Sequence, residues 1–180
     1  FAYASAESGY QALCTQNLPT PTIGATSTTQ AGKYMNAVLY TGTGASLGVT
    51  GVGFQPDLVW LKSRSNATDN ELTDAVRGTT KSLVSNSTAA EATDTNGLTA
   101  FNSDGFTVGT DANYNGSTRT YVAWNWNAGG SNATNTSGTI TSTVRANTTA
   151  GFSIVTYTGT GSAATVGHGL GVAPKMIICK

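Results

Sequence analysis

Residues 118–127 read Thr-Arg-Thr-Tyr-Val-Ala-Trp-Asn-Trp-Asn, which is the clearest β-strand pattern in the chain. Because side chains alternate between the two faces of a strand, Val122, Trp124 and Trp126 share one face. A stripe of valine and tryptophan is typical of a sandwich core, since large aromatic side chains bury the most apolar surface. We therefore expect this face to point between two antiparallel sheets. The side chains predicted to be largely buried there are Trp60, Phe106, Val122 and Trp124.

The rest of the sequence also favours strands joined by turns. Residues 58–62 form a short, nearly continuous apolar run that fits a strand of a sandwich core. The dipeptide Asp104-Gly105 lies between two apolar segments and predicts a tight hairpin, because glycine accepts a positive φ without a Cβ clash. A helical turn is suggested only within residues 71–84, where Gly78 weakens it. We expect an all-β protein built as an antiparallel β-sandwich.

A pentapeptide, Tyr-Thr-Gly-Thr-Gly, occurs twice, at residues 40–44 and 157–161. Each copy follows an apolar run and precedes a proline that opens a second apolar run, Pro56 in one copy and Pro174 in the other. The two copies are separated by the length of a whole domain, which is too long for a solenoid repeat. The repeat therefore predicts tandem modules.

The repeat also predicts how the chain divides. Residues 36–62 and 153–180 should superpose as the same pair of strands, with matching glycine turns. Cys14 and Cys179 fall outside the complete module and are expected to be free, buried thiols, with an interdomain disulfide as the second interpretation. The predicted parts are residues 1–31, the C-terminal end of a preceding β domain with a proline-containing linker; residues 32–131, a complete β-sandwich module; residues 132–150, a polar connector with a strand; and residues 151–180, the first strands of a second, truncated module.

Several functional classes are disfavoured by composition. The formal net charge is zero and only 10 % of residues are charged, so we expect no nucleic-acid partner. No apolar run approaches the ~20 residues that span a bilayer, so we expect no membrane insertion. The single histidine, His168, lies outside the complete module, which leaves no Ser-His-Asp triad or histidine metal site there. We expect no enzyme activity, no catalytic residue, no metal and no cofactor.

Two polar clusters have alternative interpretations. Asp69, Asn70, Glu71 and Asp74 could supply oxygen ligands to calcium, although their spacing differs from that of an EF-hand loop. A solvated loop is the other interpretation of these residues. Asp74 and Arg77 are spaced to form an ion pair on one helical turn, and we interpret this pair as structural. Gly105 is likewise assigned a structural role, in the hairpin turn.

Trp124 and Trp126 also permit a different hypothesis. Exposed aromatic faces stack on sugar rings, so the two indoles could form a carbohydrate-binding surface if their strand face is exposed. The core and sugar-binding interpretations make opposite predictions about burial, and the structure can separate them.

Four segments resemble successive motifs of a bacteriophage virion module common in tail-fibre and adhesin-like proteins. The resemblance implies concanavalin-like or jelly-roll-like β-sandwiches strung along a virion appendage, often trimeric, and it transfers no catalytic residue. Residues 151–180 resemble the opening of a further module, and residues 12–21 resemble the end of a SPRY-like domain. The four motifs are Pro-Asp-Leu-Val-Trp-Leu-Lys at 56–62, Asp-Ala-Val-Arg-Gly at 74–78, Asp-Gly-Phe-Thr-Val-Gly at 104–109 and Tyr-Val-Ala-Trp-Asn-Trp-Asn-Ala-Gly-Gly at 121–130.

Three functional hypotheses follow. The first is a structural virion component, a tail-fibre or adhesin segment located on the virion and involved in host attachment. Its expected partners are further copies of the chain in a trimer, other virion proteins and a host-surface glycan. The second is a lectin-like carbohydrate-binding module of a surface or secreted protein. The third, a polysaccharide depolymerase, is disfavoured because the sequence offers no clear acid/base pair.

Overall fold

The structure is a computed structural model that describes residues 30–180. Within it, Ala31–Lys180 form one compact unit that is nearly all β. The all-β prediction is therefore confirmed. The segment predicted to end a preceding domain, with Cys14, lies almost wholly outside the described residues. No helix in residues 30–180 is long and apolar enough to cross a membrane.

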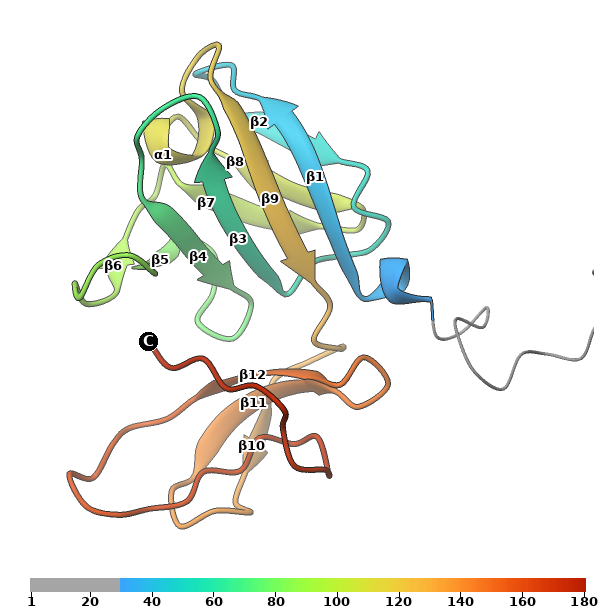
Figure 1. Cartoon of the computed structure of the whole chain (residues 1–180), viewed down its shortest axis with the longest axis vertical. Helices are drawn as coiled ribbons and strands as arrows, with labels where there is room; N and C mark the ends of the chain where they lie inside the picture. Colours follow the sequence, from blue (N-terminus) through green and yellow to red (C-terminus); the bar gives the residue numbers. More distant parts are fainter. Residues whose placement is uncertain (1–29) are drawn as a thin grey trace, which may run out of the picture. The chain divides into compact units, whose positions relative to one another are not determined.

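The strands and the α-helix of the described chain are labelled in Figure 1. The first half contains η1 (Ala31–Lys33), β1 (Met35–Thr41), β2 (Leu47–Thr50), β3 (Leu58–Ser63), β4 (Asn70–Asp74), β5 (Lys81–Val84) and β6 (Ala92–Thr93). The second half contains β7 (Leu98–Asn102), β8 (Gly105–Val108), α1 (Ala112–Asn115), β9 (Thr120–Trp126), β10 (Ala133–Asn135), β11 (Ser142–Asn147) and β12 (Phe152–Thr156).

Residues 30–180 contain three antiparallel sheets. The main sheet has six strands in the order β1-β9-β3-β4-β5-β6. The small sheet has the order β2-β8-β7 and lies behind β1, β9, β3 and β4 in Figure 1. These two sheets form the sandwich. The C-terminal sheet has the order β10-β11-β12.

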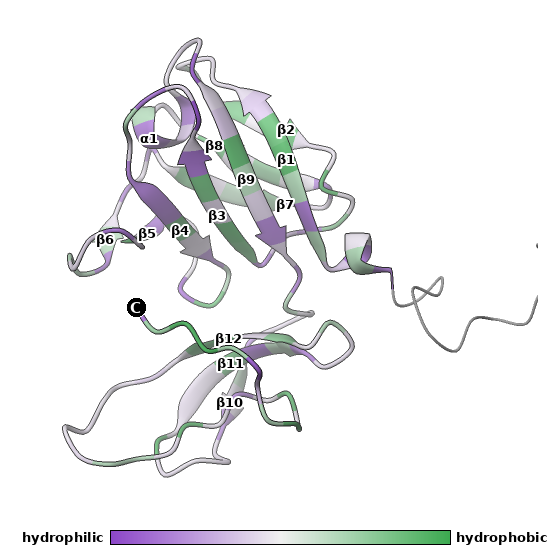
Figure 2. Ribbon diagram, in the orientation of Figure 1, coloured by the Kyte–Doolittle hydropathy of each residue, from purple (hydrophilic) through white to green (hydrophobic). Residues whose placement is uncertain are grey.

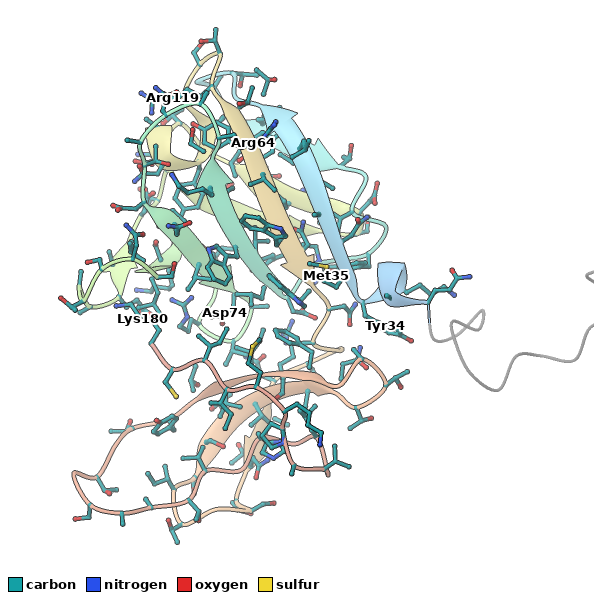
Figure 3. All side chains as sticks on the ribbon, in the orientation of Figure 1. Tyr34, Met35, Arg64, Asp74, Arg119 and Lys180 are labelled. Atoms are coloured by element: carbon teal, nitrogen blue, oxygen red, sulfur yellow. The ribbon has the colours of Figure 1, made fainter. Side chains whose placement is uncertain are left out.

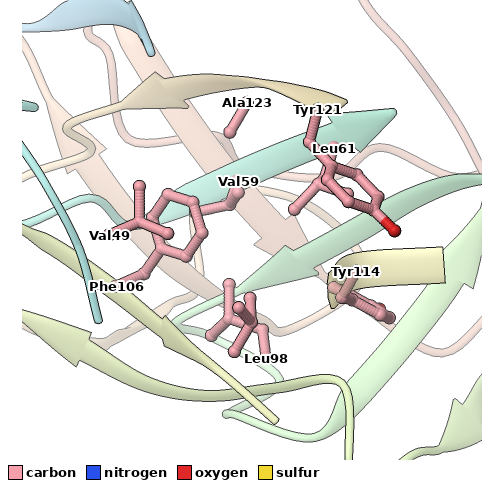
Figure 4. Packing of buried hydrophobic residues seen from close by; sticks show 9 residues of the cluster. Val49, Val59, Leu61, Leu98, Phe106, Tyr114, Tyr121 and Ala123 are labelled. Atoms are coloured by element: carbon pink, nitrogen blue, oxygen red, sulfur yellow. The ribbon is translucent and has the colours of Figure 1, made fainter. Parts of the chain in front are cut away.

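The core lies between the main and small sheets (Figure 4). The main sheet contributes Val59 and Leu61 from β3, and both are almost completely buried. Phe106, on β8 of the small sheet, is also fully buried, which confirms its predicted place in the core. Tyr114 of α1 covers one end of the cluster. Burial of these apolar side chains is the main stabilising contribution to the sandwich.

The other predicted core residues face the opposite way, so that part of the prediction is wrong. On β9 the fully buried side chains are Tyr121, Ala123 and Asn125, whereas Trp124 is only half-buried. Trp60 and Val122 are half-buried as well. A core position suits Tyr121 because its ring stacks on Tyr40, with ring centroids 5.1 Å apart.

The hydroxyl group of Tyr121 explains how a polar side chain is accommodated in this core. It donates a hydrogen bond to the carbonyl of Ala112 and accepts one from the backbone N–H of Gly116, both at 2.7 Å. A buried hydroxyl with both partners carries no desolvation penalty of the kind that an unpaired one would. The inner face of β9 can therefore be less apolar than its outer face.

The hairpin predicted at Asp104-Gly105 is present between β7 and β8. Gly105 has φ +151°, and a Cβ atom there would lie 2.0 Å from the carbonyl oxygen of Val49. The Asp104 carboxylate accepts hydrogen bonds from the backbone N–H groups of Gly51 and Gly53. The hairpin is thus tied to the loop that follows β2.

The helical turn suggested within residues 71–84 does not form. That segment contains β4, a turn and β5, and Leu72 of β4 pairs with Trp60 and Leu83 on its two neighbours. Sheet hydrogen bonding to neighbours on both sides prevails over a weak local helix preference, and Gly78 adopts φ +102° in the turn. The α-helix found in the described chain is α1.

The repeated pentapeptide forms the same turn twice. Gly44 has φ +73° and Gly161 has φ +74°. In each copy a threonine hydroxyl bridges the turn: Thr43 Oγ1 bonds the backbone of Ala45, and Thr160 Oγ1 bonds that of Ser162. The predicted match between the two glycine turns is confirmed.

The match does not extend to the strand that follows each turn. Pro56 leads into β3, which pairs with β4 and β9, whereas the segment after Pro174 forms no strand. A strand is stabilised by hydrogen bonds to neighbours, and residues 174–180 have no neighbouring strand in the described chain. The prediction that 36–62 and 153–180 form the same pair of strands is therefore wrong in its second strand. The division at residues 131 and 150 stays a prediction.

Candidate functional site

The side of the main sheet that faces away from the small sheet carries a large set of apolar side chains, which we call the outer face. Strand registers align these side chains in rows across the strands. The central row is Ala37, Trp124, Trp60, Leu72 and Leu83. The next row is Leu39, Val122, Lys62 and Asn70. Hydrophobic segments occur on neighbouring strands β1, β9 and β3 in Figure 2.

Exposure is greatest on β1, the strand at the edge of the main sheet. Leu39 is 64 % exposed and Met35, near the start of β1 in Figure 3, is 38 % exposed. The tryptophans are more protected because they cover one another: the rings of Trp60 and Trp124 meet edge to face, with centroids 6.2 Å apart and planes at 68°. The Nε1–H group of Trp60 is buried without a hydrogen-bond acceptor among the described residues.

The two tryptophans proposed for sugar stacking belong to different aromatic pairs. Trp124 contacts Trp60, whereas Trp126 stacks on Phe152, with centroids 6.0 Å apart and planes at 21°. Trp124 and Trp126 therefore do not form a shared flat platform with each other. Their role in sugar binding stays a prediction.

The polar groups bordering the outer face are already bonded within the chain. Lys62 Nζ donates to the carbonyl of Thr68 at 2.8 Å. Beyond it, the side-chain N–H of Asn86 donates to Asp69, and the amide oxygen of Asn86 accepts from Asn70. The outer face is thus apolar at its centre and bounded at one end by polar side chains that are hydrogen-bonded within the chain.

Asp74 and Arg77 form the predicted ion pair, but not on a helical turn. Asp74 ends β4 (Figure 3), and its carboxylate lies 2.6 Å from Arg77 Nε. The carboxylate also accepts the backbone N–H groups of Val76 and Arg77, while Arg77 Nη2 donates to the carbonyl of Leu72. The pair closes the turn between β4 and β5, which is the structural role assigned to it.

A second buried carboxylate, Asp57, has a role that the sequence analysis missed. One oxygen accepts the backbone N–H of Ala128 at 2.8 Å, and the other lies 2.5 Å from Arg145 Nη1. Arg145 also donates from Nε to Asn132. Asp57 follows Pro56 in the first of the four motifs that resemble the virion module. Its place in that motif was the one feature of the sequence that could have marked it as important. Its partner on β11 is remote in sequence and could not be read from any local pattern.

The calcium hypothesis placed Glu71 in an oxygen cluster, and the structure places it in a hydrogen-bond network. Ser82 and Tyr114 donate hydroxyl hydrogen bonds to Glu71, and Asn113 donates from its amide. Burial raises the pKa of Glu71, and the charges of Asp69 and Asp111 raise it further, against the lowering effect of these hydroxyl donors. The segment is a strand rather than the solvated loop offered as the alternative.

The described residues contain no group of histidine, cysteine, aspartate or glutamate side chains that could hold a metal ion. His168 Nδ1 accepts the backbone N–H of Leu170 at 3.2 Å, as a residue that stabilises a turn would. Cys179 is free but exposed, so the expectation that it is buried is wrong.

Comparison with known proteins gives one match. Residues 30–180 match the family described as a domain of unknown function (DUF7483). The chain belongs to this family. No curated protein and no solved structure was found to be similar. The DUF7483 match includes the sandwich and the C-terminal sheet together, so the outer face, the Asp57–Arg145 pair and the repeated turn all lie within the family region.

Proposed function

We propose that this DUF7483 chain is a structural component of a bacteriophage virion, a tail-fibre or adhesin segment that takes part in host attachment. The observation that carries the proposal is the structural role of charged and glycine residues in the motifs on which the resemblance depends. Asp57 and Asp74 are bonded to backbone N–H groups and arginines. Gly105 permits a close backbone contact in the hairpin.

The fourth motif behaves in the same way. Gly129, which follows β9, has φ +96°, and a Cβ there would lie 3.0 Å from the carbonyl oxygen of Ala146. The motifs thus consist of turn glycines and buried ion pairs, which stabilise the fold. A module that is repeated along a fibre needs such a stable fold. The same motifs give no support to the depolymerase hypothesis.

A lectin-like module remains the second candidate, because the outer face presents half-buried indole rings at the surface. Aromatic side chains on a sugar-binding face would be accompanied by polar groups that hydrogen-bond the sugar hydroxyls. The polar side chains next to the outer face, Lys62 and Asn70, are engaged with other groups of the chain. The virion proposal is therefore preferred.

The deciding experiment is to locate the protein on the particle. Antibodies against the purified chain, bound to gold, should label a tail appendage of the phage particles whose genome encodes it, and particles of an unrelated phage are the control. Labelling of host cells without particle labelling would refute the proposal. A glycan array and a polysaccharide-degradation assay on the same purified chain test the lectin and depolymerase alternatives directly.

A further inference from the structure

We propose that the outer face of the main sheet is the interface through which copies of this chain associate, with Leu39, Trp60 and Trp124 buried in the contact. This inference deepens the proposed function, because it rests on the chain being a fibre segment whose partner is a second copy of itself. It adds the surface that makes the contact and the residues on which the contact depends.

The outer face is as large as the largest apolar patch of a typical monomer, and such patches are often functional. Strand β9 has seven residues, and at about 3.4 Å per residue it is about 24 Å long. Strands β1, β9, β3 and β4 are neighbours at about 4.8 Å spacing and together are about 19 Å wide. The flat area is therefore about 450 Å², in the middle of the range of about 300–600 Å² for the largest apolar patch of a typical monomer. A stable complex buries about 800 Å² per partner, so the interface would extend beyond this area to the edge of β1.

The chemistry of the face favours a protein partner that is neutral and apolar. The central row, from Ala37 to Leu83, contains no charged side chain. The adjacent row has one charge, Lys62, whose ammonium group is bonded to Thr68. A charged partner would lose hydration over the central row without gaining an ion pair there. A second copy presents the same uncharged central row and loses no such hydration.

The geometry of the aromatic rings disfavours a sugar as the occupant. A pyranose ring stacks on a flat, accessible aromatic face, but Trp60 and Trp124 meet edge to face at 68° and cover part of each other. Irregular, interlocked side chains of this kind are instead complementary to another packed layer of side chains. Two main sheets placed outer face to outer face would form a second sandwich with sheets about 10 Å apart.

Three copies could also turn their outer faces toward a threefold axis. Each copy would then bury its apolar face, and β1, which lies at the edge of the main sheet, would be brought next to another copy. The segment Met35–Thr41 contains no charged residue and no proline, the usual features that protect a sheet edge from association. A closed symmetric assembly would cover this unprotected sheet edge. Both arrangements bury Leu39, so both make the same mutational prediction.

The test uses the whole chain and a matched pair of charge insertions. Leu39→Arg places a charge on an exposed position of the outer face. Thr50→Arg places the same charge on an exposed strand position of β2, where the neighbouring Val49 points into the core. Sedimentation velocity at 1–100 µM, at about 0.15 M ionic strength, should show the wild type and Thr50→Arg as oligomers and Leu39→Arg as a monomer. Far-ultraviolet circular dichroism and an unfolding curve for each variant establish that the monomer is folded.

Tryptophan fluorescence gives a second measurement. Association through another surface would leave the emission wavelength of Trp60 and Trp124 unchanged. Dissociation by Leu39→Arg should shift the tryptophan emission to longer wavelength, because Trp60 and Trp124 become more accessible to water, and Thr50→Arg should leave it unchanged. A wild type that is monomeric at 100 µM would overturn the inference. So would a Leu39→Arg variant that associates like the wild type, or an equal loss of association in both variants. Particle labelling with antibody remains independent of these results, so a fibre protein that associates through another surface would be recognised.

Discussion

The reversed facing of β9 makes Phe106 and Trp124 unequal contributors to stability, although both were expected in the core. Phe106 is fully buried and meets Tyr40 edge to face, with ring centroids 6.2 Å apart. Burying an aromatic side chain removes about 150–250 Å² from water, and at about 25 cal/mol per Å² the lower end amounts to about 4 kcal/mol. Phe106→Ala should therefore lower the free energy of unfolding by about 4 kcal/mol, within the usual range for phenylalanine truncation.

Trp124→Ala should cost about half as much, roughly 2 kcal/mol, because the space it leaves opens to solvent rather than forming an enclosed cavity. Both substitutions are best compared in the Leu39→Arg background, where unfolding is not coupled to dissociation. With a urea dependence of about 2 kcal/mol per M, the unfolding midpoint should fall by about 2 M for Phe106→Ala and by about 1 M for Trp124→Ala.

Equal destabilisation by the two substitutions, or a larger effect of Trp124→Ala, would refute this assignment of the sheet faces. Leu98→Ala serves as a positive control, because Leu98 lies in the same buried cluster as Phe106. It should cost about 2–5 kcal/mol, as expected for a buried leucine.

Three further predictions concern Gly105 and the carboxylates of Glu71 and Asp104. Gly105→Ala should destabilise the hairpin by more than about 2 kcal/mol, because its Cβ would overlap the carbonyl of Val49; an unchanged urea midpoint would contradict this. The raised pKa of Glu71 means that the folded state holds this proton more tightly than the unfolded chain, so its stabilising contribution is present below the ordinary pKa of 4.5 and is lost as pH rises through the raised value. Glu71→Gln should remove this loss of stability. When urea midpoints are measured at pH 4, 6 and 8, the midpoint of Glu71→Gln should rise relative to that of the wild type as the pH increases. The N–H groups of Gly51 and Gly53 lower the pKa of Asp104, so its contribution is present above the ordinary value of 3.8 and lost as pH falls through the lowered one. Asp104→Asn should therefore be less stable than the wild type at pH 7 and equal to it in acid, and a constant difference across pH would count against this bond.

The outer face changes how the tryptophan-rich motif of this DUF7483 chain is interpreted. A stripe containing Val122 and Trp124 was taken as a core signal, and the structure turns it outward. If copies associate as proposed, the motif still specifies a core, one formed between chains. The sequence pattern and the monomer fold would then be consistent with each other.

Local features could be predicted from the sequence because local chemistry decides them. The Asp104-Gly105 hairpin forms since only glycine fits the backbone approach to Val49. The two Tyr-Thr-Gly-Thr-Gly turns match because a threonine hydroxyl and a glycine with positive φ, Gly44 or Gly161, are sufficient to make each one. Alternation along β9 separated its side chains correctly into two sets.

Tertiary structure alone decided which of those two sets is buried. The alternation has period two and is symmetrical, so it cannot say which face meets the second sheet. Hydropathy favoured burying Trp124, yet the sandwich buries Tyr121, because Tyr40 stacks on its ring and Gly116 and the carbonyl of Ala112 satisfy its hydroxyl. Those partners come from β1, from α1 and from the residue that follows α1, and the arginine that pairs with Asp57 comes from β11. The sequence by itself determined the strand at β9, the glycine turns and the all-β class, whereas the choice of core face and the buried pairings depended on contacts between different elements of the fold.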